Sequence, residues 1–298
     1  MPDKLYEIEQ NDAWVTGPGG IQLFLNICAP QRQKYAGMQF PAVVNVPGGL
    51  GSGAQMPKFF APYGFIDVRY CPPGRGAGTP EDPRSEGVEN HNGFIGQDGL
   101  KAAIEYVYSL PEVDKTCLGL FSGSFGISLA AGVLGRYPNL PVHYLIDFEG
   151  PSDSEIICFE PWKGIDDTRI ERGYRMFGHY SLLKDASPAN IAWWREREAV
   201  QTIGKIRVPY LRIQAEEDHA QPVGVYRHAL DLVNLATLGE SPWTRLNGSD
   251  IGNPVNVTYD IQDPACHPRF HPGQFPKNQG KELQYVKEMT ALVKQEKL

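Results

Sequence analysis

Short apolar runs that alternate with amphipathic stretches constrain this chain more than any other feature of its sequence. Runs suited to buried strands occur at residues 40–47, 64–71, 116–121, 141–150, 208–219 and 243–248. Stretches with helical spacing of their apolar residues occur at 96–113, 125–138, 222–239 and 280–295. Strands that alternate with helices predict a mostly parallel central sheet with helices on both faces, an α/β fold.

Two segments depart from this alternation. Residues 13–30 contain two extended runs around a Gly-Pro-Gly-Gly turn, which predicts an antiparallel hairpin. Residues 152–203 show no strand pattern and are much longer than a simple crossover connection. We therefore expect a core domain built from 1–151 and 204–298, with a helical cap insertion at 152–203 over the carboxyl edge of the sheet. Seven large aromatic residues lie in this insertion: Phe159, Trp162, Tyr174, Phe177, Tyr180, Trp193 and Trp194.

The charge balance argues against several kinds of partner. The 298 residues carry a formal net charge of −7 without a cluster of Lys or Arg, which disfavours nucleic acid and anionic membranes as partners. The first residues lack the apolar core of a signal peptide, and no run reaches the length of a transmembrane helix. The five cysteines are scattered, as is typical of reduced thiols. We expect a cytoplasmic protein, compatible with a homo-oligomer.

The stretch LGLFSGSFGISLAAG, from Leu118 to Gly132, places Ser124 between a strand pattern and a helix pattern. A serine hydroxyl is a poor nucleophile unless a base removes its proton and the backbone exposes its oxygen. A sharp strand-to-helix turn lifts the side chain above the sheet and directs helix amides at the site. Such a turn needs small residues two positions before and after the serine, and Ser122 and Gly126 meet this need. Ser124 is the candidate nucleophile, and a loop of small residues is the simpler alternative.

An acid that follows a later strand can orient a histidine and stabilise its charged form. Three consecutive acids lie near the end of the run at 208–219. Among them, Asp218 fits a small-x-x-Asp-x-x-x-Pro spacing that ends at Pro222. Asp147 and Glu149, near the end of the previous strand run, are the alternative acids, and a solvated acidic loop is the simpler interpretation.

Two histidines, His267 and His271, lie between the last strand run and the final helix pattern. The chain order is then Ser, acid, His, as in enzymes that carry their nucleophile on a strand-to-helix turn. Their four-residue spacing suits zinc on a helix, but Pro268 and Pro272 disfavour a helix here. The glycine-rich loops contain neither a P-loop nor a dinucleotide fingerprint. We expect no metal and no cofactor.

Taken together, these motifs resemble the α/β-hydrolase superfamily, in particular its branch of dienelactone hydrolases, prolyl-oligopeptidase-like enzymes and cocaine-esterase-like acyl hydrolases. The resemblance rests on FPAVVNVPGG (strand and oxyanion loop), PPGRGAGTPED (Arg-Gly-x-Gly loop) and YVYSLPEVDKTCLGLFSGSFG (helix, turn and nucleophile strand). It covers most of Phe40–Leu298, except 152–203 and 249–279. Pro47 departs from it, because the family often has a histidine there that shapes the loop without acting as the base.

The resemblance implies roles for further residues. The oxyanion donors are the backbone N–H of Phe125 and that of Gly49 or Leu50. FHPGQF is similar to a Phe-His-Gly-Phe motif of some esterases, which favours His271 as the base. His267 stays open as the alternative base.

We therefore expect a serine hydrolase that cleaves the carboxylic ester of a small or medium substrate through Ser124, His271 and Asp218 and an acyl-enzyme. The expected partner is a small-molecule ester. The first alternative is an amidase or peptidase of the same fold. The second is a protein of this fold that binds ligands without catalysis.

Overall fold

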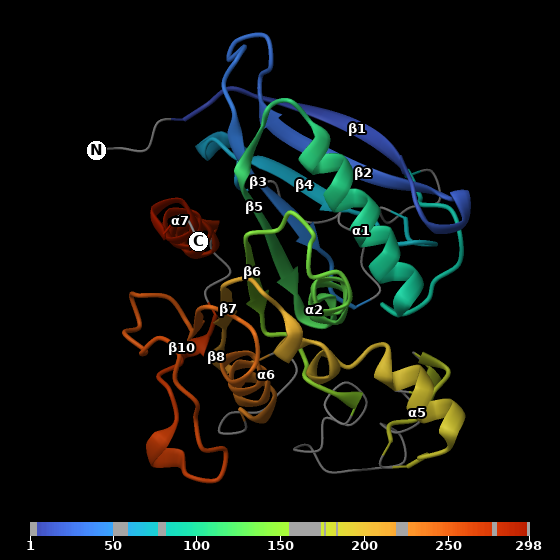
Figure 1. Ribbon diagram of the computed structural model, residues 1–298, viewed down its shortest axis with the longest axis vertical. Coiled ribbons are helices and arrows are strands. Elements are labelled where there is room, and N and C mark those ends of the chain that lie inside the picture. Colours follow the sequence, from blue (N-terminus) through green and yellow to red (C-terminus); the bar gives the residue numbers. More distant parts are fainter. Residues whose placement is uncertain are drawn as a thin grey trace.

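Eight strands form the central sheet in the order β1-β2-β4-β3-β5-β6-β7-β9 (Figure 1). The computed structural model describes residues 5–49, 59–76, 82–154, 174–175, 177–182, 184–218, 226–275 and 279–296. The strands of this sheet are β1 (Ile8–Thr16), β2 (Gln22–Pro30), β3 (Phe40–Val46), β4 (Ile66–Tyr70), β5 (Val113–Gly123), β6 (Tyr144–Phe148), β7 (Tyr210–Ile213) and β9 (Thr244–Leu246). The strands from β4 to β9 in this order are parallel, which confirms the predicted sheet.

The first two strands form the predicted antiparallel hairpin. Their register runs from Ile8 opposite Pro30 to Thr16 opposite Gln22. Gly19 and Gly20 have φ values of 68° and 84° in the connecting turn, a left-handed conformation that side chains disfavour. The hairpin then joins the parallel strands through the antiparallel pair of β2 and β4.

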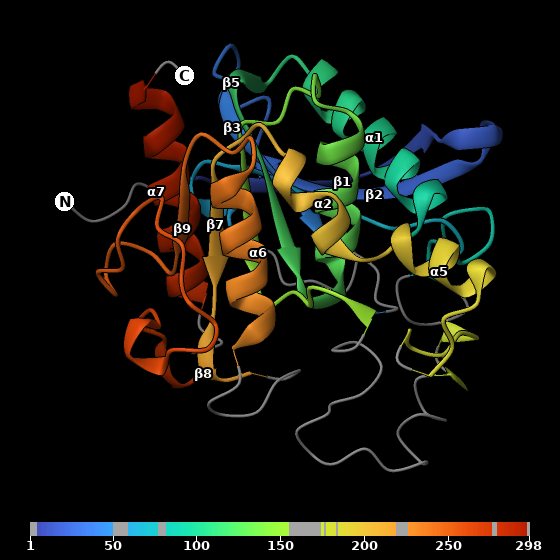
Figure 2. The same cartoon turned by 60° about the horizontal axis from the view of Figure 1, so that its bottom comes forward.

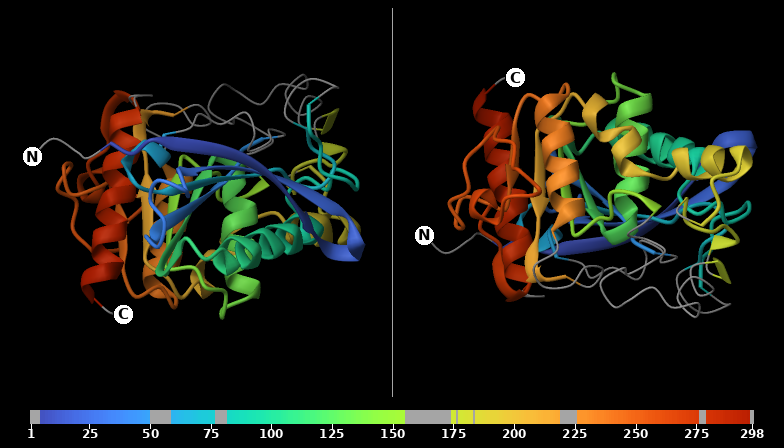
Figure 3. Two further views of the ribbon diagram at one scale, coloured as in Figure 1. Left: turned by 90° about the horizontal axis from the view of Figure 1, so that it is seen from above. Right: turned by 90° about the horizontal axis from the view of Figure 1, so that it is seen from below.

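Helices cover both faces of the sheet, as predicted (Figures 2 and 3). They are α1 (Phe94–Ser109), α2 (Ile127–Arg136), α6 (Arg227–Leu238) and α7 (Gln279–Glu296). Alternate residues of a strand point to opposite faces. Val44 accordingly packs in one core with Leu100 of α1 and residues of α2 and α6. Its neighbour Val43 packs in a second core with Met289 of α7.

The run at 208–219 forms two strands. After β7, the short strand β8 (Ala215–Glu217) pairs in parallel with β10 (His271–Gln274) outside the main sheet. β10 was not expected from the sequence, because His-Pro-Gly-Gln does not have the composition of a strand. The pairing depends on tertiary contacts, among them the bond from His271 N to Gln214 O of 3.2 Å.

The described part of the predicted insertion includes the helix α5 (Pro188–Arg195), which lies at the edge of the molecule in Figure 2. Ser187 caps α5 by accepting from Asn190 N, and Pro188 opens it. Ala199 and Ile203 are buried in the same core as α2 and α6. The last residues of the insertion therefore pack with the core domain, while its boundary near 203 stays a prediction.

In the described part of the chain, no helix combines the length and the apolar character that crossing a membrane requires.

A buried ion pair joins β6 and β7 below the carboxyl edge of the sheet. Asp147 and Arg212 are register partners, and both side chains are 0% exposed. Arg212 Nη1 donates to Asp147 Oδ2 at 2.6 Å, and Tyr210 Oη donates to the same oxygen at 2.9 Å. The second bond of Arg212 Nη1, to Gly150 O at 2.6 Å, ties this pair to the loop that follows β6. Such a pair is costly to break because a lone charge then remains buried.

We expect Arg212→Met to lower the free energy of unfolding by about 3–5 kcal/mol, because Asp147 then lacks its cation. The double variant Asp147→Leu/Arg212→Met leaves no lone charge and should regain most of that loss. Urea unfolding at pH 7 measures both. Equal losses in the single and double variants would contradict this account.

Candidate active site

Ser124 lies on a sharp turn at the carboxyl end of β5, where a short 3-10 turn (Ser124–Gly126) leads into α2. Its φ is 48°, a left-handed conformation that is unfavourable for a serine. A Cβ added at Gly48 would come within 2.8 Å of Ser124 Cβ and 2.6 Å of Gly123 O. A Cβ added at Gly126 would come within 2.7 Å of Val46 O. The turn is therefore packed tightly against the end of β3, which explains the small residues around the serine.

The backbone groups that the resemblance implies as oxyanion donors lie at this contact. Phe125 follows Ser124 and is 4% exposed. Gly49 follows the close contact at Gly48 and has a φ of 53°, a conformation suited to glycine. Leu50, the alternative donor, lies outside the described residues. The described residues thus bring Ser124 and the Gly48–Gly49 loop together on neighbouring strands.

Aromatic residues of the insertion cover Phe125. The rings of Phe125 and Phe177 are 5.5 Å apart, and Phe177 packs on Trp194 at 5.7 Å. Phe177 and Trp194 are 5% and 0% exposed, so they form a small core over the turn. Phe159 and Trp162 lie outside the described residues, while the other predicted aromatics are described: Tyr174, Phe177, Tyr180, Trp193 and Trp194.

Asp218, the predicted acid, directly follows β8 and has a side chain that is 1% exposed. Its Oδ2 accepts from Gln214 Nε2 at 2.9 Å and lies 2.9 Å from His228 Nε2. Gln214 Oε1 accepts in turn from Arg212 Nη2 at 2.6 Å. Because a guanidinium only donates, this bond fixes the orientation of the Gln214 amide. The Asp218 carboxylate is thus held by a chain of hydrogen bonds that begins at the buried Arg212–Asp147 pair.

The two alternative acids differ in their surroundings. Asp147 is committed to the ion pair with Arg212. Glu149 is 4% exposed and has a φ of 48° one residue beyond Phe148, which is the register partner of Gly123. Glu149 therefore lies just after β6, the strand that pairs with β5 next to the Ser124 turn, and stays an alternative acid.

His271, the favoured base, begins β10 and is 3% exposed. Its Nε2 lies 2.6 Å from Tyr285 Oη, and Tyr285 Oη donates to Asp250 Oδ1 at 3.0 Å. A carboxylate only accepts, so the single hydroxyl proton of Tyr285 points to Asp250 and His271 Nε2–H is the donor to Tyr285. The lone pair of neutral His271 is then on Nδ1. Burial lowers the pKa of His271, while Asp250 raises it and Lys281 lowers it further.

His267, the alternative base, lies in the long segment that connects β9 and β10. Its Nε2 is 3.3 Å from Ile261 O, and its ring packs edge-on against Tyr226 at 6.3 Å.

The structure brings together the segments that carry two of the three predicted catalytic residues, Asp218 and His271. The pairing of β8 with β10 places the backbone of His271 opposite Ala215, three residues before Asp218. Within the described residues, however, the hydrogen bond of the His271 ring is to Tyr285, and Asp218 is bonded to His228. The partners His228 and Tyr285 were not expected from the sequence. Both lie on helices at positions without a motif, so only the tertiary packing could identify them.

The strain at Ser124 leads to a stability prediction. Ser124→Gly and Ser124→Ala both remove the hydroxyl, but only glycine relieves the left-handed strain. We expect the glycine variant to unfold with a free energy about 1 kcal/mol higher than the alanine variant. Urea unfolding of the two variants measures the difference, and an alanine variant of equal or greater stability would argue against strain at this residue.

Comparison with known proteins gives structural matches alone. No protein-family model and no curated protein matches the sequence. Many solved structures match this chain.

Three of these structures come from proteins that are named as peptidases. A puromycin-hydrolyzing peptidase of Mycobacterium tuberculosis has a TM-score of 0.64 at 15% identity, over 99% of this chain and 40% of that one. An acylaminoacyl peptidase of Pyrococcus horikoshii has a TM-score of 0.58 at 18% identity, over 84% and 39%. Dipeptidyl peptidase 4 of Porphyromonas gingivalis has a TM-score of 0.58 at 13% identity, over 96% and 35%. This chain thus spans well under half the length of these proteins. The mostly parallel sheet and the structural matches over nearly the whole chain show that the chain has the α/β-hydrolase fold.

Proposed function

We propose that this chain is a serine hydrolase that cleaves the carboxylic ester of a small or medium substrate. The observation that carries the proposal is the backbone at Ser124. It is held at a φ of 48° between β5 and α2, against a glycine of the β3 loop. Strained residues persist where the surrounding structure over-determines them, and they cluster at active sites. A nucleophile exposed on such a turn is the known solution for acyl transfer on this fold.

In the proposed reaction, Ser124 Oγ attacks the acyl carbon and its proton passes to His271 Nδ1. The backbone N–H groups of Phe125 and Gly49 stabilise the tetrahedral oxyanion, a contribution of roughly 3 kcal/mol for each donor. His271 then protonates the leaving alcohol, and water repeats the cycle on the acyl-enzyme. Asp218 is the proposed acid that stabilises the imidazolium. In the usual triad Nε2 takes the proton, so the bond from Nε2 to Tyr285 is the unusual feature of this proposal.

An amidase or peptidase is the second candidate, because the solved structures of similar fold are named as peptidases. The same nucleophile and oxyanion donors serve both reactions. The leaving amine of an amide must be protonated as it departs, so proton transfer from the histidine is more important for an amide than for an ester. Esters and p-nitroanilides with matched acyl groups separate the two candidates. Turnover of esters alone supports the esterase, and comparable kcat/KM for anilides supports the peptidase.

We expect a fluorophosphonate probe to label the wild-type protein and to leave Ser124→Ala unlabelled, with the adduct located on Ser124 by mass spectrometry. With p-nitrophenyl esters from acetate to decanoate, kcat of the alanine variant should fall by about 10⁴- to 10⁶-fold, as in other serine hydrolases. A wild type that resists labelling, or an alanine variant that keeps its turnover, would disprove the role of Ser124.

The choice between the two candidate bases also has a direct test. His271→Ala should lower kcat by at least about 10³-fold, whereas His267→Ala should change it little. A general base must be neutral, so kcat/KM should rise as the pH rises through the pKa of His271, which burial places below its ordinary value.

Asp250→Asn sharpens this test, because Asp250 raises the pKa of His271. Its removal should move the acidic limb of the pH–rate profile to lower pH. A limb that does not move in Asp250→Asn, together with inactivity of His267→Ala, would assign the base to His267.

A further inference from the structure

A turn that is strained at two consecutive residues lies beside the nucleophile and is not part of the chemistry proposed above. His91 and Asn92 have φ values of 51° and 65°, just before α1 begins. Left-handed conformations are uncommon for residues other than glycine. Two in succession persist only when tertiary contacts hold them. The tertiary contacts of this turn therefore indicate which part of the molecule it positions.

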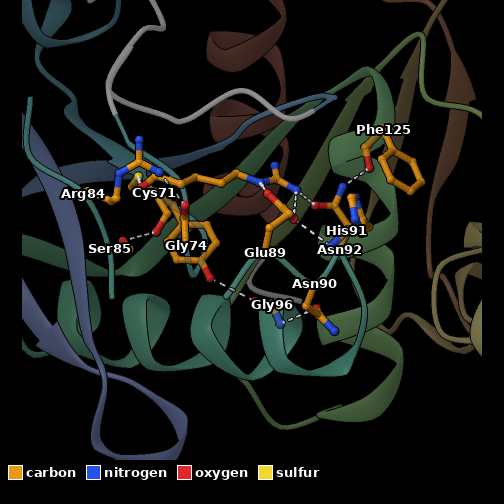
Figure 4. A network of polar contacts seen from close by, with 12 residues as sticks. Cys71, Gly74, Arg84, Ser85, Glu89, Asn90, His91, Asn92, Gly96 and Phe125 are labelled. Atoms are coloured by element: carbon orange, nitrogen blue, oxygen red, sulfur yellow. Dashed lines mark hydrogen bonds and ion pairs between the residues drawn. The ribbon is translucent and has the colours of Figure 1, made fainter. Parts of the chain in front are cut away.

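A buried arginine holds the turn in place. The Arg75 side chain is 2% exposed, and its Nη2 donates to Glu89 Oε1 at 2.9 Å and to Asn92 Oδ1 at 2.6 Å. Glu89 Oε1 also accepts from His91 N at 2.6 Å. Figure 4 shows Glu89, His91 and Asn92 close together, with the side chain of Asn92 directed toward Phe125. Arg75 thus fixes both the backbone and the side chain of the turn.

The orientation of the Asn92 amide follows from this contact. Arginine only donates, so the atom that faces Arg75 must be Oδ1 and the atom on the other side must be Nδ2. Nδ2 donates to Phe125 O at 2.7 Å. Asn92 is 2% exposed, so water does not compete for these bonds. The amide is therefore a rigid bridge between a buried guanidinium and the residue that follows Ser124.

The same turn is bonded to the helices on either side of it. Gln97 Nε2 donates to Asn92 O at 3.3 Å, to Ser128 O of α2 at 3.4 Å and to Glu196 O at 2.7 Å. Arg197 Nη2 donates to Asn90 O at 2.9 Å. The turn is thus connected to α2 and to the residues that follow α5.

We propose that Asn92 is a positioning residue that holds Phe125 so that its N–H points at the oxyanion. This inference rests on the proposed function. Phe125 is fixed at its carbonyl by Asn92 and at its ring by Phe177. Since the N–H belongs to the same residue, rotation of Phe125 would turn the donor away. The left-handed backbone at Asn92 is what brings its amide to Phe125 O.

The test uses Asn92→Gly and Asn92→Asp. Glycine relieves the backbone strain and loses the donor, whereas aspartate keeps the bond to Arg75 and sets an acceptor against Phe125 O. Both should lower kcat by about 10- to 100-fold with KM within about twofold. Both should bind a trifluoromethyl ketone transition-state analogue more weakly by the same factor. Unchanged kcat in a folded Asn92→Gly variant would overturn the proposal.

A matched control comes from the same turn. Asn90 Oδ1 accepts from Gly96 N at 3.1 Å, so Asn90→Ala removes a side-chain bond to α1 and leaves Phe125 untouched. It should lower stability without changing kcat. A drop in kcat equal to that of the Asn92 variants would mean that general loosening of the turn explains the effect and would overturn the proposal.

Hydrogen–deuterium exchange tests whether Asn92 holds Phe125, and it does not depend on a measurement of enzyme activity. The peptide that covers 122–128 should exchange faster in Asn92→Gly than in the wild type. Equal exchange would contradict the proposal that Asn92 holds Phe125. Fluorophosphonate labelling of Ser124 in the wild type tests the proposed function separately. If the wild type is not labelled but Asn92→Gly still exchanges faster, the proposed hydrolase function is rejected, while the proposal that Asn92 holds Phe125 is retained.

Discussion

The close approach of β3 to the turn at Ser124 is the constraint on which the site depends. Parallel pairing of β3 with β5 brings Val46 opposite Ser122, so the residues that follow each strand meet at the carboxyl edge. The contact is so tight that Gly48 has no room for a side chain. Tight backbone contact excludes water and fixes the relative position of the serine and the β3 loop, which is the preorganisation that oxyanion stabilisation requires.

The other half of the site depends on different strands and a different kind of interaction. Asp218 is held by Gln214 and His228, at the end of a network that begins with the buried Arg212–Asp147 pair. His271 is held by Tyr285 of α7. Charged and polar groups in a low-dielectric interior need partners, and here His228 of α6 bonds Asp218 while Tyr285 of α7 bonds His271. The proton acceptor of the proposed mechanism is for this reason Nδ1 of His271.

Sequence reasoning worked where a function depends on neighbouring residues in the chain. The sharp turn at Ser124, the glycines of the loop after β3 and the β1–β2 hairpin all follow from local requirements for small residues or positive φ, as at Ser124 and Gly19. It failed at β10, whose residues have no strand propensity of their own. It also passed over Asn92, because Asn90-His-Asn-Gly resembles any polar turn until Arg75 and Phe125 are seen on either side of it.

The sequence by itself determined the α/β alternation, the position of the candidate nucleophile and the order in which serine, acid and histidine occur. These properties are local, since strand and helix periodicity and the steric needs of a sharp turn act over a few residues. The helical partners of Asp218 and His271, which are His228 and Tyr285, were decided by tertiary structure alone. They lie 10 and 14 residues away along the chain, on helices whose docking brings them into contact. A hydrogen bond between side chains requires a distance near 3 Å and a fixed direction, and only the packed fold supplies both.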